Sequence, residues 1–331
     1  MRKLNFISGN DIALLHCGAD YFSRMLSEID QATQEIYLET YIFADDATSA
    51  KVQAALCQAA GRGVQVRVIV DWVGSGYGRS ELLAKEFINA GVACRSFNPW
   101  FKRGLARTHR KICVIDRRVA IVGGLNIIDD LISDDGSGLI LDFPRWDFAV
   151  HITGDLVANI HFEIRAQWLR IGKMSLISRL KLIRNLRSQE RSSSAQPMQA
   201  AFVIRDNLRN RATIQRAYLQ ALGLARKRAI LVTPYFAPGG KFRRALISAA
   251  SRGVDVTLLI GVGQLPKLLG QGGGGLAQGV AQRLLHLRQL HTEAVQLLVL
   301  RADHITLLCQ QRLLKMSQRG AQLLARACGA A

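Results

Sequence analysis

The chain has 331 residues, of which 49% are hydrophobic and 21% charged, so disorder is excluded as its general state and two domains are allowed. It holds no run of about 18 apolar residues that would indicate a transmembrane helix, and the apolar part of residues 1–10 is too short for a signal peptide. The cysteines lack the spacing of a zinc site and are predicted to be buried thiols of a protein on the cytosolic side: Cys17, Cys57, Cys94, Cys113, Cys309 and Cys328.

The net charge of +19 is concentrated in the second part of the chain. Residues 1–150 hold 17 Lys/Arg and 18 Asp/Glu, a net charge of −1, whereas residues 151–331 hold 27 and 7, a net charge of +20. A basic field of this size indicates an anionic partner, either acidic lipid or nucleic acid. An ordinary solvated basic surface explains the charge equally well.

The first hundred residues predict alternating helices and strands. Residues 10–18 are predicted to be a short connector, and Phe22, Met25 and Ile29 recur at helical spacing in the segment that follows. The predicted helices lie at 19–31, 47–60 and 79–90, and the predicted strands at 35–43, 64–70 and 92–97. Because a helix connects the first two strands, we expect these strands to be parallel.

Polar residues at the ends of these strands are candidates for a ligand pocket. Glu39 and Tyr41 lie on the first strand and Asp71 follows the second, at the edge where open α/β sheets bind ligands. Ordinary polarity at strand ends is an equally good explanation. The glycines at 74–78 have the spacing of neither a dinucleotide-binding loop nor a P-loop, so no such site is predicted.

The segment 108–126 combines a predicted β-hairpin with residues suited to phosphorus chemistry. Apolar stretches at 110–115 and 119–122 flank a polar turn. His109 and Lys111 are two residues apart, so on a strand their side chains point to the same face. A lysine neutralises the non-bridging oxygens of a phosphate while a histidine supplies a nucleophilic nitrogen, so the pair favours attack on phosphorus.

Further residues of this segment stand at fixed offsets from the pair: Asp116, Gly123, Gly124 and Asn126. A lone His-x-Lys on an edge strand occurs often by chance, whereas the whole set makes coincidence improbable. The segment resembles the HxKxxxxD motif of the phospholipase D superfamily, with its downstream Gly-Gly-x-Asn. Arg145-Trp146-Asp147 and Gly154 resemble the following segment of the bacterial cardiolipin synthases in this superfamily.

The chain beyond the motif changes character. Its acidic loop is predicted to be a solvated turn rather than a metal site, because no histidine or glutamate completes the ligand set of Asp129, Asp130, Asp134 and Asp135. A strand at 148–152 and a helix at 155–168 follow. Residues 165–191 carry eight basic side chains and one acid between apolar residues, which favours contact with the headgroups of an anionic membrane. A linker helix packed on its own protein is the alternative.

An internal repeat indicates two domains. Residues 55–66 return as residues 245–256 at an offset of 190, and residues 36–43 correspond to 230–236 with a small gap. A second His-x-Lys-x4-Asp is therefore expected about 40–50 residues after the strand at 254–260, and none occurs. Because the composition also changes there, we hypothesise a shift of reading frame near residues 261–275, which the nucleotide sequence would test; divergence into amphipathic helices is the rival explanation.

The resemblance implies a fold and a domain plan. The fold is α/β, a duplicated phospholipase D-type sandwich in which helices flank a mixed sheet, with the second copy incomplete. The predicted parts are a first domain with the motif at 1–164, a basic segment and linker at 165–199, and a second domain at 200–331 that is aberrant after about residue 261.

The resemblance also implies a reaction, the transfer of a phosphatidyl group between phosphatidylglycerol molecules to form cardiolipin. His109 would be the nucleophile that becomes a phosphohistidine, Lys111 would bind the phosphate, and Asp116 would orient and charge-balance the site. Asn126 would donate a hydrogen bond to a phosphoryl oxygen. The other residues expected at the substrate are Gly124, Glu39 and Tyr41. No metal or organic cofactor is expected, because lysine and histidine supply the positive charge.

The missing second motif leaves three functions open. The first is a cardiolipin-synthase-type transferase that is inactive or weak alone, because the acid for the leaving alcohol would come from the second histidine. The second is a phosphodiesterase or nuclease in which a homodimer assembles two motifs, although nucleic acid is the less favoured partner. The third is a non-catalytic protein of the membrane surface. The expected location is peripheral on the cytoplasmic side of the cell membrane, and a homo-oligomer is allowed.

Overall fold

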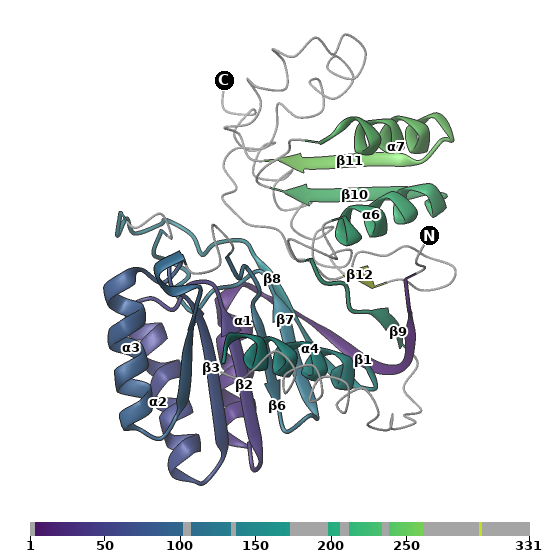
Figure 1. The fold of residues 1–331 in the computed structure, drawn as a ribbon. Coiled ribbons are helices and arrows are strands. Elements are labelled where there is room, and N and C mark those ends of the chain that lie inside the picture. The colour runs from purple at the N-terminus through teal and green to yellow at the C-terminus, as the bar shows by residue number, and fades with distance from the viewer. Residues whose placement is uncertain are drawn as a thin grey trace, which may run out of the picture.

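The computed structural model describes residues 4–101, 107–133, 137–172, 198–205, 212–233, 238–260 and 298–299 (Figure 1). Most of these residues form one large mixed sheet covered by helices, and a smaller unit of two strands and two helices follows in the chain. The predicted α/β fold, with a mixed sheet flanked by helices, is confirmed. No helix within the described ranges is both long enough and apolar enough to cross a bilayer.

Nine strands form the large sheet in the order β12-β9-β1-β8-β7-β6-β2-β3-β4. Their bounds are β1 Ile7–His16, β2 Glu35–Thr40, β3 Gln65–Asp71, β4 Ala93–Phe97, β6 Ile112–Ile115, β7 Val119–Gly123, β8 Phe148–Gly154, β9 Met198–Ala201 and β12 Leu298–Val299. The strands β2, β3 and β4 are parallel, as their connecting helices predict, and the other pairings are antiparallel. The carboxyl ends of β2 and β3 therefore lie side by side at one edge.

Helices cover both faces of this sheet (Figure 1). The helices α1 (Cys17–Asp30), α2 (Ala47–Gly61) and α3 (Tyr77–Asn89) bury Met25, Leu56 and Phe87 against one face, and α4 (Leu156–Ile171) buries Ile160 and Ile164 against the other. A short 3₁₀ turn, η1 (Pro99–Phe101), follows β4. Because both faces are covered, all six residues of β2 are buried, which explains its nearly continuous apolar sequence.

The connector predicted at residues 10–18 is wrong, because most of it belongs to β1 and the rest begins α1. β1 pairs with β8 along seven residues that are distant in sequence, so local composition carried no signal for it. Asn10 is fully buried in β1; its Nδ2 donates to Ile7 O at 2.7 Å and its Oδ1 accepts from Leu156 N at 2.7 Å. β1 thereby caps the first turn of α4.

The sequence repeat corresponds to a structural repeat. The elements α6 (Thr213–Leu224), β10 (Arg228–Thr233), α7 (Gly240–Ser251) and β11 (Asp255–Ile260) follow in the order of α1, β2, α2 and β3, and β10 and β11 are parallel. Gly63 and Gly253 both precede the second strand of their unit with positive φ, 90° and 85°, which favours glycine. The expected place of the second motif and the basic residues 173–191 lie outside the described residues.

The predicted domain limits stay a prediction. Within the described residues, α4 continues to Ile171 and β9, at Met198–Ala201, pairs with β1 in the large sheet. The segment on either side of the basic residues is therefore joined to the first unit.

Glu35, at the start of β2, links α4 and the motif hairpin to the sheet. Its Oε1 lies 3.1 Å from His161 Nε2 on α4 and 2.5 Å from Arg117 Nε in the turn between β6 and β7. Burial by itself would raise the pKa of Glu35, but the contacts with His161 and Arg117 outweigh it and lower the pKa to about 2. The ionised carboxylate is therefore favoured by folding.

The ionised carboxylate of Glu35 gives a prediction for acid unfolding. Because the folded-state pKa lies below the unfolded value, the contribution of Glu35 is complete above about pH 4.5 and is lost as the pH falls towards 2. We expect this contribution to be about 3 kcal/mol. Urea unfolding as a function of pH measures it, with Glu35→Gln as the comparison. An equally steep loss of stability in Glu35→Gln over this range would contradict the prediction.

Candidate active site

The structure brings His109 and Lys111 together at the carboxyl end of β2, in the extended segment that precedes β6. Lys111 Nζ lies 3.1 Å from His109 Nδ1 and 3.3 Å from His109 Nε2, so the two side chains share a face as predicted. The imidazole of His109 is exposed, whereas Lys111 is only 4% exposed. A buried ammonium group therefore stands directly behind an imidazole that solvent and substrate can reach.

Tyr41 completes this cluster from the loop after β2. Its ring centroid lies 4.7 Å from that of His109, and Lys111 Nζ lies 5.4 Å from the centre of the Tyr41 ring. The exposed Arg107 donates to Tyr41 Oη at 3.2 Å. Lys111 and Tyr41 thus flank the imidazole, and Arg107 contacts the far end of the Tyr41 ring; the substrate contact predicted for Tyr41 stays a prediction.

Thr108 anchors the motif segment to two buried carboxylates, a role that the sequence analysis missed. Its N–H donates to Asp71 Oδ2 at 2.8 Å, and its hydroxyl donates to Glu39 Oε1. Asp71 is 1% exposed and also accepts the N–H groups of Val73 and Gly74 through Oδ1, at 3.0 Å and 2.9 Å. Because β2 and β3 are adjacent parallel strands, their terminal acids hold the residue directly before His109.

Glu39 lies beneath this site rather than on its surface. It is fully buried, and burial raises the pKa of its carboxyl, while Arg110 and the hydrogen bond from Thr108 lower it less. Among the described residues, its Oε2 has no hydrogen-bond partner. Glu39 was predicted to contact substrate; the structure places it as a support for Thr108.

The two glycines at the end of β7 are required by close packing against β8 and the residue before it. A Cβ on Gly123 would lie within 2.5 Å of Ala149 Cα, and one on Gly124 would meet the carboxylate of Asp147. Asn126, two residues on, is 7% exposed and accepts the N–H of Ile42 through Oδ1 at 3.2 Å. This bond ties Asn126 to the loop after β2, so the Gly-Gly-x-Asn sequence belongs to the same edge as His109.

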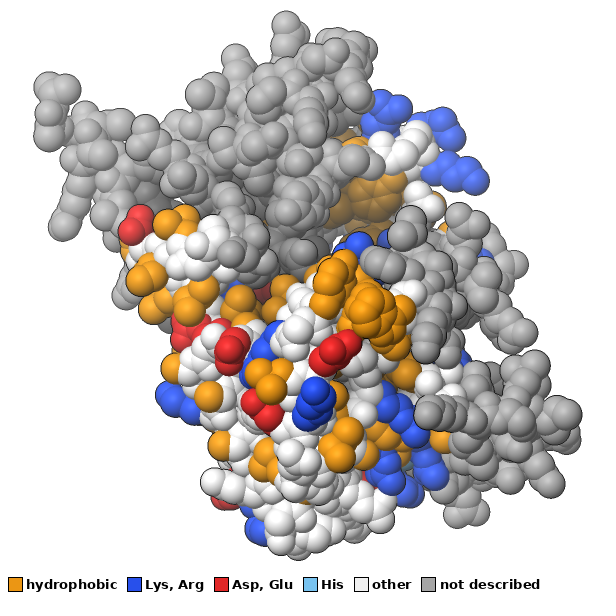
Figure 2. Space-filling model, turned by 60° about the vertical axis from the view of Figure 1, so that its left-hand side comes forward, with side chains coloured by type: hydrophobic (Ala, Val, Ile, Leu, Met, Phe, Trp, Pro, Cys, Tyr) orange, Lys and Arg blue, Asp and Glu red, His pale blue; other side chains and the backbone are white. Residues whose placement is uncertain are grey.

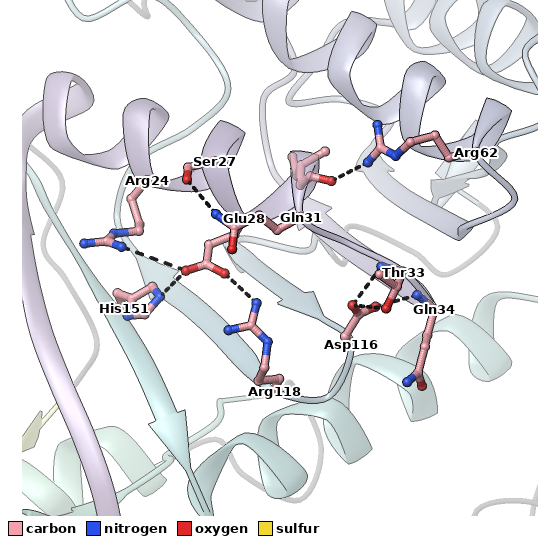
Figure 3. Close-up of polar contacts among 11 residues, drawn as sticks. Arg24, Ser27, Glu28, Gln31, Thr33, Gln34, Arg62, Asp116, Arg118 and His151 are labelled. Atoms are coloured by element: carbon pink, nitrogen blue, oxygen red, sulfur yellow. Dashed lines mark hydrogen bonds and ion pairs between the residues drawn. The ribbon is translucent and has the colours of Figure 1, made fainter.

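Asp116 does not belong to this site, contrary to its predicted role as the acid that orients it. It lies in the turn at the opposite end of β6, with φ of 51°, beside the beginning of β2 (Figure 3). Its carboxylate accepts the backbone N–H groups of Thr33, Gln34 and Glu35 at 2.8–2.9 Å. Burial opposes these bonds, but they lower the pKa of Asp116 below its usual value. Asp116 therefore fixes the hairpin to the beginning of β2.

A second polar cluster is centred on the buried Glu28. Glu28 of α1 accepts Arg118 Nη2 at 2.9 Å and lies 2.9 Å from His151 Nε2, with Arg24 4.0 Å away (Figure 3). It joins α1, the motif hairpin and β8, at the far end of the hairpin from His109. Its geometry indicates a structural role.

The acidic loop is not the solvated turn that was predicted, as far as it is described. Asp129 accepts the hydroxyl of Thr48 at 2.8 Å, and the carboxylate of Asp130 accepts the N–H of Gly18. Burial raises the pKa of Asp130 above its usual value. Within the described residues, no group of three His, Cys, Asp or Glu side chains is arranged to hold a metal ion.

Comparison with known proteins agrees with the motif. The family described as "Cardiolipin synthase, PLD-like domain" matches residues 25–135. Cardiolipin synthase B of Salmonella typhi is 36% identical over 277 residues, which cover 78% of this chain and 61% of the relative. The major cardiolipin synthase ClsA of Bacillus subtilis (strain 168) is 30% identical over 261 residues, covering 77% and 52%. The chain thus spans less than two thirds of the length of these curated relatives.

A solved structure shares the fold. The crystal structure of phosphatidylserine synthase from Haemophilus influenzae Rd KW20 superposes with a TM-score of 0.58 at 13% identity, covering 78% of this chain and 63% of that one. The matched region contains His109 and Lys111, and together with the sequence relatives it makes the chain similar to the cardiolipin synthases of the phospholipase D superfamily.

Proposed function

We propose that the chain carries one half-site of a phosphatidyltransferase that makes cardiolipin from phosphatidylglycerol. A ring nitrogen of His109 attacks the phosphorus of one phosphatidylglycerol, the bond from phosphorus to the glycerol headgroup breaks, and glycerol leaves after taking a proton from solvent water. A hydroxyl of a second phosphatidylglycerol then attacks the phosphohistidine and gives up its proton to water, the bond from phosphorus to nitrogen breaks, and cardiolipin and the free imidazole result.

The observation that carries this proposal is the exposed imidazole of His109 backed by the buried ammonium of Lys111, at 3.1 Å and 3.3 Å from its two ring nitrogens. A charge held in place at low solvent exposure stabilises developing negative charge on the phosphoryl oxygens without reorganising. The Oδ1 of Asn126 is engaged with Ile42 N, which orients its amide NH₂ as a donor for such an oxygen.

The proposed half-site lacks its general acid. The only His-x-Lys-x4-Asp in the 331 residues is the one at His109. General acid catalysis contributes about 10²- to 10⁴-fold, so we expect turnover of phosphatidylglycerol by this chain alone to be slower by at least that factor than in a two-motif enzyme. A substrate whose leaving group departs as a stable anion does not need the acid.

The proposal places the chain at a membrane surface, where phosphatidylglycerol is found. In the unit formed by α6, β10, α7 and β11, residues 212–233 and 238–260 hold eight Lys/Arg and one acid, Asp255. A surface of this charge attracts anionic lipid. The cytoplasmic leaflet is the expected side.

Two substrates compared side by side test the proposal. The full chain is mixed with phosphatidylglycerol and with a phosphatidyl ester of p-nitrophenol, and cardiolipin and nitrophenolate are measured. We expect slow or undetectable cardiolipin formation and a much faster release of nitrophenolate. If no nitrophenolate is released at any lipid concentration or temperature, and DNA is cleaved instead in a His109-dependent manner, the phosphodiesterase alternative replaces the transferase.

Asp116 gives a prediction that separates support from chemistry. Replacing it with alanine leaves three backbone N–H groups without their acceptor, so the free energy of unfolding should fall by about 2–4 kcal/mol. Asp116→Asn should lose less, because asparagine tolerates positive φ and keeps one acceptor oxygen. Urea unfolding measures both, and nitrophenolate release per folded molecule should stay within a few-fold of wild type. A large loss of release in fully folded Asp116→Asn would restore Asp116 to the site.

A further inference from the structure

Exposed hydrophobic side chains gather at the edge of the sheet that carries His109. Ten large hydrophobic side chains of the described residues are strongly exposed, and six of them lie at this edge, at the beginning of α3, in η1 or in the segment after β7. We call these six the apolar rim: Tyr77, Trp100, Leu131, Leu139, Ile140 and Phe143. Figure 2 shows the largest groups of hydrophobic side chains on the upper part of the large unit rather than spread evenly over it.

One part of the rim is an aromatic stack beside the motif. The ring of the buried Trp72 lies 4.2 Å from Tyr77 and 5.1 Å from Trp100 between centroids. Trp72 directly follows Asp71, whose carboxylate holds the N–H of Thr108. The stack is therefore attached to the same strand end as the His109 segment, while Trp100 is 69% exposed.

The other part is a short hairpin after the motif. Its two arms are joined by the bonds Ser133 N to Leu139 O at 2.8 Å and Leu141 N to Leu131 O at 2.7 Å. Ile140, in its second arm, and Phe143, which follows that arm, are 76% and 80% exposed.

The segment that leads into this hairpin is fixed to the beginning of α2. Asp129 N donates to Asp46 Oδ2 at 2.9 Å, and the hydroxyl of Thr48 donates to Asp129 Oδ2 at 2.8 Å. Asp46 is the N-cap of α2, which follows β2 in the chain. Both parts of the rim thus rise from the edge where His109 is exposed.

We infer that the apolar rim inserts into the interfacial layer of a bilayer and so turns His109 toward the lipid headgroups. This inference rests on the proposed function, because a phosphatidyl phosphorus lies at that depth. Aromatic and aliphatic side chains on two separate loops match an interface with an apolar interior, where each gains from leaving water. The exposed Asp142 lies between rim residues, so attraction to anionic lipid is not what drives this contact.

The rim and the basic unit differ in their response to salt. Attraction of the basic residues at 212–260 to anionic lipid is screened at about 1 M salt, where the Debye length is about 3 Å. Insertion of apolar side chains persists there. Binding that survives high salt therefore reports on the rim.

Trp100 provides the measurement. The other three tryptophans, Trp72, Trp146 and Trp168, are less than 10% exposed, so lipid-dependent changes in emission report mainly on Trp100. The full chain is mixed at high salt with vesicles of phosphatidylglycerol and phosphatidylethanolamine, with and without brominated acyl chains. We expect a blue shift and quenching by the brominated lipid, and neither in Trp100→Phe.

A double variant tests the hairpin, and a matched pair on α3 controls for exposure. Ile140→Ser with Phe143→Ser should weaken vesicle binding at high salt by at least about ten-fold. Leu82→Ser with Ile88→Ser changes side chains that are 50% and 60% exposed and lie outside the rim, so it should bind as wild type does.

Three outcomes would overturn the inference. Wild-type binding by the Ile140/Phe143 variant is the first, and an equal loss in the Leu82/Ile88 pair is the second. The third is a dimer in the absence of lipid that the rim variant dissociates while vesicle binding is unchanged, because the rim would then be an interface between copies. Vesicle binding is measured without turnover, so failure of the proposed function leaves these binding results intact. Failure of the rim to bind lipid, in turn, leaves the measured release of nitrophenolate unaffected.

Discussion

Replacing His109 with alanine is expected to abolish nitrophenolate release, by about 10⁴-fold or more, with little change in stability. The variant lacks the nitrogen that forms the bond to phosphorus, and removal of a covalent nucleophile costs more than removal of any supporting group. The imidazole is exposed, so its loss should alter the free energy of unfolding by no more than about 0.5–1 kcal/mol. Release of nitrophenolate and urea unfolding measure the two effects separately.

Chemical rescue sharpens this prediction. In His109→Gly, added imidazole can occupy the space beside Lys111 and restore release, whereas a variant that has lost the fold gains nothing. Lys111→Met keeps the nucleophile and removes the ammonium, so a smaller loss of about 10²–10³-fold is expected. Equal activity of wild type and His109→Ala would contradict the assignment.

Asp71→Ala is expected to have the largest effect on stability and to weaken the site as well. Three backbone N–H groups, of Thr108, Val73 and Gly74, would lose their buried acceptor, which should lower the free energy of unfolding by about 3–5 kcal/mol. The segment before His109 would also lose its anchor to β3. Release of nitrophenolate by the folded fraction should therefore fall by about ten-fold or more, since small displacements of a reacting group are costly.

Asp45→Ala is the matched control for this change. Asp45 is 82% exposed, and Arg79, its ion-pair partner at 3.6 Å, keeps Glu86 at 3.4 Å, so removal of Asp45 should leave stability within about 0.5 kcal/mol. Urea unfolding compares the two variants, and hydrogen exchange at the Thr108 amide shows the local effect. Normal protection of that amide in Asp71→Ala would show that the carboxylate does not anchor the motif.

Local periodicity predicted the helices and parallel strands of the first unit, because those elements bury continuous apolar faces. β1 and β9 were missed since each depends on antiparallel partners far away in the sequence. The repeat identified β10, α7 and β11 because the same residues recur at a fixed offset. The fold was thus predictable wherever the signal was local or duplicated.

The site was predictable only in part. His109 and Lys111 share a face because residues two apart on an extended segment point the same way. Asp116 follows Lys111 by five residues, and the rise of about 3.3 Å per residue along β6 places it at the opposite end of that strand. The support from Asp71 and Glu39 to Thr108 depends on the alignment of β2 with β3, which no motif records. Motif spacing therefore located the proposed nucleophile, His109, and grouped with it Asp116, an acid that contacts the beginning of β2.

The most direct test of the account is to locate the phosphatidyl group on the protein. The full chain is mixed with the phosphatidyl ester of p-nitrophenol, quenched in base to preserve phosphohistidine, digested and examined by mass spectrometry. We expect one nitrophenolate released per protein in an initial burst and a phosphatidyl adduct on His109, absent from His109→Ala. Continuous release with no adduct, or an adduct on another residue, would contradict the central claim that His109 is the nucleophile of a phospholipase D-type half-site.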